Sequence, residues 1–237
     1  MKKGQFQRRK KGRFIVIDGI DGSGKATQSK LLENYLMSNG LKVKNIDFPR
    51  YYDNFFGQFI GECLSGEHGD FINADPRMTS VLYAADRFES SKQIKNWLNK
   101  GFWVIADRYV SANQIHQGGK IKNSAKRRSF LDWLEKMEHG VFELPYPDLV
   151  IYLDVTIDIS KEWLEKKDAK KRKKYLKGKK DLAEKDIEYL KNSRNAALNL
   201  EKKNENWKKI MCYKKGKSLD PEEVNKLVVD VINKELN

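Results

Sequence analysis

The stretch RFIVIDGIDGSGK, residues 13–25, decides the fold of this 237-residue chain. Residues 14–18 form an apolar run that predicts a buried strand, and residues 19–25 match the pattern G-x-x-x-x-G-K. A helical pattern follows to about residue 39. Glycines accept positive φ angles and carry no Cβ, so this loop can turn backbone N–H groups inward, where the helix N-terminus and Lys25 add positive charge. The segment therefore predicts a cradle for the phosphates of a nucleoside triphosphate.

Four further apolar runs predict strands, at residues 43–48, 102–106, 149–153 and 210–213. Helical patterns separate them, at residues 75–100, 156–166, 181–203 and 221–236. Alternating strands and helices predict a parallel sheet with helices on both faces. We therefore expect an α/β fold of the P-loop NTPase kind, with three α/β/α layers around a five-stranded parallel sheet.

The net charge of +14 is concentrated in two segments, residues 1–13 and the lysine-rich stretch 166–180. The rest of the chain is nearly neutral, so the composition does not call for a nucleic-acid-binding face. We expect residues 1–12 to be a disordered basic tail, with RNA or polyanion contact as a minor alternative. Residues 13–237 are expected to form a single domain, since no linker or internal repeat divides them.

Nothing in the sequence suggests a membrane protein or a secreted one. No run approaches the roughly 20 apolar residues that span a bilayer, and the basic N-terminus lacks the apolar stretch of a signal peptide. Cys63 and Cys212 are far apart and lack metal-site spacing. These features favour a reducing cytoplasm.

Polar and aromatic residues follow the predicted strands, at the edge where parallel sheets bind ligands. Arg108 follows the third strand, and Arg87 lies on the long helix before it. Both are candidates to grip a second phosphate, because a planar guanidinium matches phosphate oxygens two at a time. Asn113 and Gln117 each offer a donor and an acceptor, as recognition of a base edge requires.

Aromatic residues near the same edge could stack on a flat ring, and Phe48 or Tyr83 are the candidates. His116 and His139 have no partner pattern for acid–base chemistry, and transfer between two phosphates needs little proton movement.

The order and spacing of several motifs resemble those of the thymidylate kinases, nucleoside monophosphate kinases that phosphorylate dTMP with ATP. The matching segments span nearly the whole chain beyond Gly12. They are VIDGIDGSGKATQ (16–28), FPRY (48–51), GEHGD (66–70), LYAADR (82–87), ADRYVSAN (106–113), HQGGK (116–120), LPYPDLVIYLDV (144–155) and DLAEKDIEYL (181–190).

The resemblance implies roles for individual residues. The ATP site would comprise Gly19, Ile20, Asp21, Gly22, Ser23, Gly24, Lys25, Ala26 and Thr27. The dTMP site would comprise Asp21, Phe48, Arg50, Tyr51, Tyr83, Arg87, Arg108, Asn113, Gln117 and Glu184. The catalytic set would be Asp21, Lys25, Arg108 and Arg172, the last in a helical lid at about residues 166–182.

Within the dTMP site the implied roles differ by position. Phe48 and Tyr83 would flank thymine, Tyr51 would lie near the sugar, and Asn113 and Gln117 would read the base. The acceptor phosphate would be gripped by Arg50, Arg87 and Arg108. Mg²⁺ is the implied cofactor, with Asp21 and Glu184 as its candidate ligands, and a homodimer is the implied assembly.

The chain departs from the family pattern at the phosphate loop and the lid. Ala26 stands where a Ser or Thr commonly ligates Mg²⁺, and Gly22 stands where some members carry an arginine. Catalytic cations should then come from the lid, yet Arg172 is its only arginine. Ala183 also stands where we expect a larger residue, and nothing explains that difference.

Two other functions are alternatives to a dTMP kinase. One is a kinase for another nucleoside monophosphate such as dUMP, since one methyl group is worth only about 1–3 kcal/mol to a pocket. The other is a P-loop nucleotide-binding regulator with a basic nucleic-acid-binding tail. The segments FPRY and DRYVSAN argue against the regulator, because a regulator needs no second phosphate site.

Overall fold

A five-stranded parallel sheet forms the centre of the computed structural model, which describes residues 12–168 and 186–236. The strand order is β2-β3-β1-β4-β5, and every neighbouring pair is parallel. The strands are β1 (Arg13–Asp18), β2 (Val43–Asp47), β3 (Trp103–Asp107), β4 (Leu149–Asp154) and β5 (Trp207–Met211). This arrangement confirms the expected fold class, although β5 begins three residues earlier than the apolar run 210–213.

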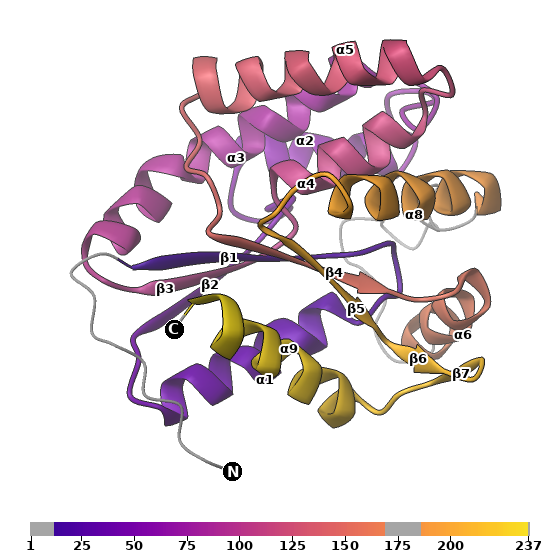
Figure 1. Cartoon of the computed structure of the whole chain (residues 1–237). Helices are drawn as coiled ribbons and strands as arrows, with labels where there is room; N and C mark the ends of the chain where they lie inside the picture. The colour runs from indigo at the N-terminus through magenta and orange to yellow at the C-terminus, as the bar shows by residue number, and fades with distance from the viewer. Residues whose placement is uncertain (1–11, 169–185, 237) are drawn as a thin grey trace.

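Helices cover both faces of the sheet, which explains why its central strands are apolar throughout. Alternate residues of β1 point to opposite faces: Phe14 and Val16 belong to one buried cluster, Ile15 and Ile17 to another. The face with Ile15 packs against α1 (Lys25–Ser38) and α9 (Pro221–Leu236). The opposite face packs against α3 (Pro76–Asn99) and α8 (Ile187–Glu201), and Figure 1 shows the resulting three layers.

Shorter elements complete the described chain. Two of them are π-helices, which are uncommon and often occur at functional sites. They are η1 (Asn113–Gln117), which continues the short helix α4 (Val110–Ala112), and η2 (Lys136–Val141), which continues α5 (Ser124–Glu135). The others are α2 (Phe55–Leu64), α6 (Ile157–Asp168), β6 (Tyr213–Lys214) and β7 (Lys217–Ser218).

Local chemistry accounts for the helix boundaries. Asp75 caps α3, because its carboxylate accepts hydrogen bonds from the backbone N–H groups of Arg77 (2.9 Å) and Met78 (3.2 Å), and Pro76 occupies the first helical position. Asp186 caps α8 in the same way, by accepting from the N–H of Tyr189.

Two predicted segments fall largely outside the described residues. These are the basic tail at 1–12, of which only Gly12 is described, and the lid at about 166–182, of which the backbone is described as far as Asp168. Arg172 and Glu184 also lie outside the described residues, so their roles stay predictions. Among the helices that the structure describes, none is both long and apolar enough to cross a membrane.

Candidate active site

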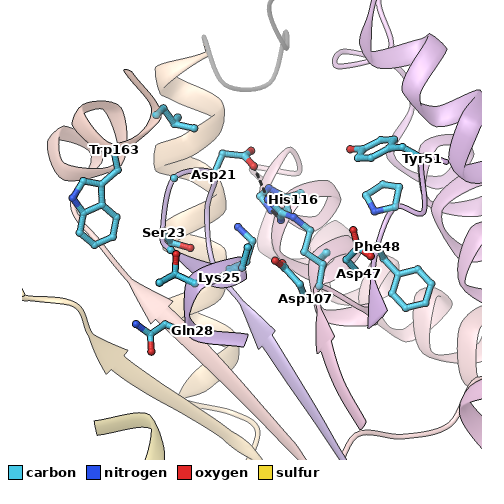
Figure 2. A pocket seen from close by; sticks show the side chains of 18 of the residues that line it. Asp21, Ser23, Lys25, Gln28, Asp47, Phe48, Tyr51, Asp107, His116 and Trp163 are labelled. Carbon is cyan, nitrogen blue, oxygen red and sulfur yellow. Dashed lines mark hydrogen bonds and ion pairs between the residues drawn. The ribbon is translucent and has the colours of Figure 1, made fainter. Parts of the chain in front are cut away.

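A cavity of about 680 Å³ opens at the carboxyl ends of the strands, within the size range of ligand sites. It extends from the phosphate loop and α6 to the segment that follows β2. Figure 2 shows one side of it formed by Trp163, Ser23 and Gln28, the other by Phe48 and Tyr51, with Lys25, Asp107 and His116 between them. After the roles expected from the sequence, we call two parts of it the phosphate end (Asp21, Lys25, Arg108 and His116) and the base end (Arg87, Asn113 and Gln117, with the buried Glu138 in contact with the first two).

The phosphate loop adopts the conformation that its glycines allow. Gly22 and Gly24 have φ angles of 72° and 87°, in the left-handed region that favours glycine, and Gly24 is the N-cap of α1. The loop therefore ends on a helix N-terminus, where unpaired N–H groups and the helix dipole attract anions. Ser23 adds a buried hydroxyl that has no hydrogen-bond partner among the described residues.

Lys25 is folded back onto its own loop. Its Nζ donates to the backbone carbonyls of Gly19 (3.1 Å) and Ile20 (3.0 Å), and the residue is only 8% exposed. Burial, together with the neighbouring Arg108 charge, lowers the pKa of Lys25 to about 8, although nearby carboxylates oppose the shift. An incoming phosphate would supply the missing negative charge, so the site is electrostatically prepared for an anion.

Helix α6 packs directly on the phosphate loop. The Ser160 hydroxyl donates to the backbone carbonyl of Asp21 at 2.6 Å. A Cβ built on Gly22 would lie 2.5 Å from the Ser160 carbonyl oxygen, so position 22 has no room for an arginine in this conformation. The departure from family members that carry an arginine there thus has a steric basis.

Arg108 occupies a strained backbone position at the end of β3. Its φ is 68°, unusual for a residue with a side chain, and its N–H donates to the Ile17 carbonyl at 3.0 Å. Its Nη2 donates to Asp21 Oδ1 at 2.6 Å. Burial works against the charged form of Arg108, but the carboxylates of Asp21, Asp18 and Asp107 outweigh it and raise the pKa. Arg108 is therefore a permanent cation beside the phosphate loop.

His116 holds the other side of the Arg108 guanidinium. Arg108 Nη1 lies 2.6 Å from His116 Nε2, and His116 Nδ1 lies 3.2 Å from the Ser193 hydroxyl. Burial and the Arg108 charge lower the pKa of His116 to about 3, so the ring is neutral. Since the guanidinium can only donate, Nε2 must accept and Nδ1 must carry the proton. The ring also stacks on Tyr189 at a centroid distance of 5.6 Å.

Arg87 lines the cavity and is held by a buried carboxylate, and its expected role at the acceptor phosphate stays a prediction. Its Nε and Nη2 donate to Glu138 at 2.7 and 2.8 Å, and its Nη1 donates to the Tyr109 carbonyl at 3.2 Å. Asn113 Nδ2 donates to the same carboxylate at 2.8 Å. The predicted phosphate ligand and the predicted base reader thus share one buried anion, because a buried arginine requires a partner of opposite charge.

The other predicted base-binding residues also line the cavity. Gln117 is 3% exposed, and its Oε1 has no hydrogen-bond partner among the described residues. Such an unpaired buried acceptor is costly unless a ligand satisfies it. Phe48, Tyr51 and Tyr83 present aromatic surface to the same cavity.

Of the remaining predicted site residues that the structure describes, some line the cavity and one does not. Ala26 and Thr27 line the cavity at the start of α1, both exposed. Arg50 is not among the described residues that line it, and its Nη2 forms an ion pair with Asp53 at 2.9 Å. Its role at the acceptor phosphate stays a prediction, without support from this geometry.

Sequence reasoning missed three residues of the site. His116 shows no acid–base partner in the sequence, and its partner in the structure is the Arg108 cation that it orients. Glu138 carries no signal in the sequence, since it lies in a charged helical stretch and is identified only by its complete burial. Ser160 lies 139 residues from the loop carbonyl that it binds. The one available signal was that His116 directly precedes Gln117 in a predicted ligand segment.

Comparison with known proteins gives a consistent result. The family model described as thymidylate kinase matches residues 17–219. A thymidylate kinase of Plasmodium falciparum is 35% identical over 147 residues, which cover 62% of this chain and 63% of that protein. A thymidylate kinase of Thermosipho africanus is 35% identical over 155 residues, covering 65% of this chain and 72% of that protein.

The fold has a counterpart among solved structures. The thymidylate kinase of Candida albicans superimposes with a TM-score of 0.70 and 23% identity, over 96% of this chain and 94% of that one. This likeness concerns the fold alone. The family model covers most of the chain and includes the phosphate loop, the end of β3 and the base end. By this match the chain belongs to the thymidylate kinase family.

Proposed function

We propose that this protein transfers the γ-phosphoryl group of ATP to dTMP, giving dTDP and ADP. The observation that carries the proposal is the meeting of Lys25 and Arg108, from separate strand ends, in one cavity that also contains a base-reading end. A nucleotide-binding regulator needs the first cation only. A phosphotransferase between two nucleotides needs both, because the two phosphate groups repel one another.

Catalysis would rest on placement and electrostatics, with no covalent intermediate. The N–H groups of the phosphate loop and Lys25 would hold the donor phosphates, and Lys25 would exchange the Gly19 and Ile20 carbonyls for phosphate oxygens. Arg108 would hold the acceptor phosphate and stabilise the charge that develops during transfer. Because His116 and Asp21 already fix the guanidinium, little reorganisation is required.

Mg²⁺ is the cofactor that this reaction implies, and the residues present are compatible with it. Mg²⁺ prefers oxygen ligands and is usually bound by one or two carboxylates plus substrate phosphates and water. Asp21 provides a partly exposed carboxylate, and Ser23 provides a buried hydroxyl without a described partner. Within the described residues no cluster of three His, Cys, Asp or Glu side chains forms a site of its own. Asp21 would hold the ion, which would neutralise phosphate charge; Glu184 stays a second candidate ligand.

An acceptor screen tests the proposed function directly. ADP release would be followed with ATP and Mg²⁺ and each nucleoside monophosphate in turn, including dTMP, dUMP, dCMP, dGMP and AMP. We expect dTMP to be the best acceptor. Turnover with dTMP no faster than the rate without acceptor would refute the proposal, and a clear preference for dUMP would redirect it to a uracil nucleotide.

Assembly and location belong to the same proposal. Family membership supports a homodimer in the cytoplasm, and light scattering of the purified protein would measure the assembly. A mass of one chain, 27.7 kDa, across the concentrations used for activity would exclude the dimer.

A further inference from the structure

Glu138 is a completely buried carboxylate whose partners are two residues of the cavity wall. It lies in the π-helix η2 with 0% exposure, and it accepts hydrogen bonds from Arg87 Nε, Arg87 Nη2 and Asn113 Nδ2 at 2.7–2.8 Å. The Arg87 side chain is 1% exposed. A buried charge is costly unless it is paired and hydrogen-bonded, and both conditions are met here. The Glu138–Arg87 ion pair could serve stability alone, but both hydrogen-bond partners of Glu138, Arg87 and Asn113, line the cavity.

The contacts of Asn113 fix the direction of its amide. Its Nδ2 donates to Glu138 Oε1 at 2.8 Å and to the Ser80 backbone carbonyl at 3.1 Å, so both N–H bonds of the amide are used. The opposite orientation would place Oδ1 against two acceptors and leave it unpaired. Asn113 must therefore turn Oδ1 away from Glu138, and no hydrogen bond found among the described residues uses that oxygen.

Gln117 and Arg87 supply the other hydrogen-bonding groups at the base end. Gln117 Oε1 is a second acceptor without a described partner. Arg87 has five N–H groups, three of which are used by Glu138 and Tyr109, so it offers donors only. Since both residues line the cavity, a base that binds here would meet the free acceptor of Asn113 and the remaining donors of Arg87.

We propose that Glu138 is a positioning residue that sets this hydrogen-bond pattern and thereby selects the base. The inference rests on the proposed function, which it deepens by naming a residue that determines base specificity. A thymine or uracil edge, with an N–H next to a carbonyl oxygen, complements the pattern. A cytosine edge has a ring-nitrogen acceptor next to an amino donor, so it faces like groups at both positions.

The test compares discrimination between dTMP and dCMP in the wild type and in Glu138→Gln. A site built to hydrogen-bond its ligand rejects the mismatched base strongly, so we expect the wild type to favour dTMP by about 10³-fold or more in kcat/KM. A glutamine at position 138 would offer one acceptor and one donor group, so it cannot hold both Arg87 and Asn113 as Glu138 does. We expect KM for dTMP to rise about tenfold, KM for ATP to stay within about twofold, and the dTMP preference to fall about tenfold or more.

The control is Glu135→Gln, an exposed carboxylate three residues earlier, which should leave discrimination unchanged. If the role of Glu138 were purely structural, Glu138→Gln would reduce activity with dTMP and dCMP by the same factor and leave their ratio unchanged. That result would overturn the proposal. If the Gln variant does not fold, Glu138→Asp keeps the acceptor-only group; retained preference supports the proposal, and lost preference contradicts it.

Calorimetric binding of dTMP and dCMP separates this inference from the proposed function. Wild-type protein that binds dTMP in preference to dCMP but does not phosphorylate it would refute the kinase proposal and leave the role of Glu138 standing. Equal binding of the two nucleotides by the wild type would overturn the role of Glu138, whatever the turnover.

Discussion

The phosphate end and the base end of the cavity hold their cations in opposite ways. Lys25 rests on two backbone carbonyls, and the shortest ion pair of Arg108 is with Asp21, whose side chain is 21% exposed, while the buried Asp18 lies farther away at 3.8 Å. A phosphate can replace the two carbonyls at Lys25 without leaving a charge buried, and Arg108 can stay oriented by Asp21 and His116. Arg87 rests on Glu138, which is 0% exposed and accepts hydrogen bonds from two cavity residues. Arg87 cannot separate from Glu138 without leaving an unpaired carboxylate in the protein interior.

This difference matches what each end must do. Phosphate charge develops and moves during transfer, so Lys25 should have partners that a phosphate can replace, and Arg108 should already be oriented. The shape of a base does not change, so the groups that read it are best held still. Substitutions at the phosphate end should therefore act on turnover, and substitutions at the base end should act on the choice of acceptor.

Arg108→Ala should give the largest effect. Loss of a preorganised donor to developing charge costs about 10²–10³-fold in kcat, and the base end should still bind dTMP within about tenfold of the wild-type KM. Steady-state kinetics with ATP and dTMP, alongside thermal unfolding, measures both quantities. Arg128→Ala, an exposed arginine on α5, is the control. Normal turnover of a folded Arg108→Ala variant would contradict the assignment of Arg108 to the active site.

The pKa of Lys25 predicts a pH limit for the phosphate end. A lysine whose pKa is lowered to about 8 is charged below that pH and neutral above it, so kcat/KM for ATP should be level from about pH 6.5 to 7.5. Above pH 8, kcat/KM for ATP should decrease, with a slope that approaches tenfold per pH unit. In the ATP complex the phosphates favour charged Lys25, so kcat should persist to higher pH.

The variant Lys25→Arg separates the titration of Lys25 from that of other groups, because arginine stays charged at these pH values. In this variant the fall of kcat/KM above pH 8 should disappear, although the activity itself should be lower. Lys120 is the matched comparison. Burial lowers its pKa to about 8 as well, yet it is not among the described residues that line the cavity, so Lys120→Arg should keep the fall above pH 8. A wild-type profile that stays level to about pH 9.5 would contradict the assignment to Lys25.

The same comparison explains how far the sequence could be read. The sheet follows from apolar runs and the phosphate loop from its glycines, because both depend on neighbours in the sequence. Arg108, Asn113 and Gln117 could be found because a strand end is a position that the fold class predicts. Glu138 and Ser193 could not, because their partners Arg87 and His116 lie 51 and 77 residues away. The Glu138 partner of Arg87 could not be predicted either, since the sequence cannot show which carboxylate a buried arginine meets, and the role of Arg87 at the acceptor phosphate stays a prediction.

His116→Ala should lower kcat about tenfold through Arg108, because one of the two groups that orient the guanidinium is lost. His116→Gln should recover part of the loss, because a Gln carbonyl oxygen can accept from Arg108 as Nε2 does. A general acid or base would behave differently, since Gln cannot transfer protons. The dTMP-over-dCMP preference should be unchanged in both variants, because His116 contacts the phosphate end and not Glu138. Equal damage from Ala and Gln would contradict the orienting role.

Ala26→Ser should give the smallest effect, confined to the metal. Ala26 is exposed at the first turn of α1 and lines the cavity, so a hydroxyl there would lie beside the phosphates that hold Mg²⁺. We expect the Mg²⁺ concentration for half-maximal activity to fall about two- to fivefold, because one oxygen ligand would be added to the proposed set of Asp21 and phosphate. A Mg²⁺ titration at saturating ATP and dTMP measures this, with Ala26→Gly as the control that changes the position without adding oxygen. Identical titrations for the three proteins would mean that position 26 does not reach the ion, and the metal would then depend on Asp21 and on groups beyond the phosphate loop.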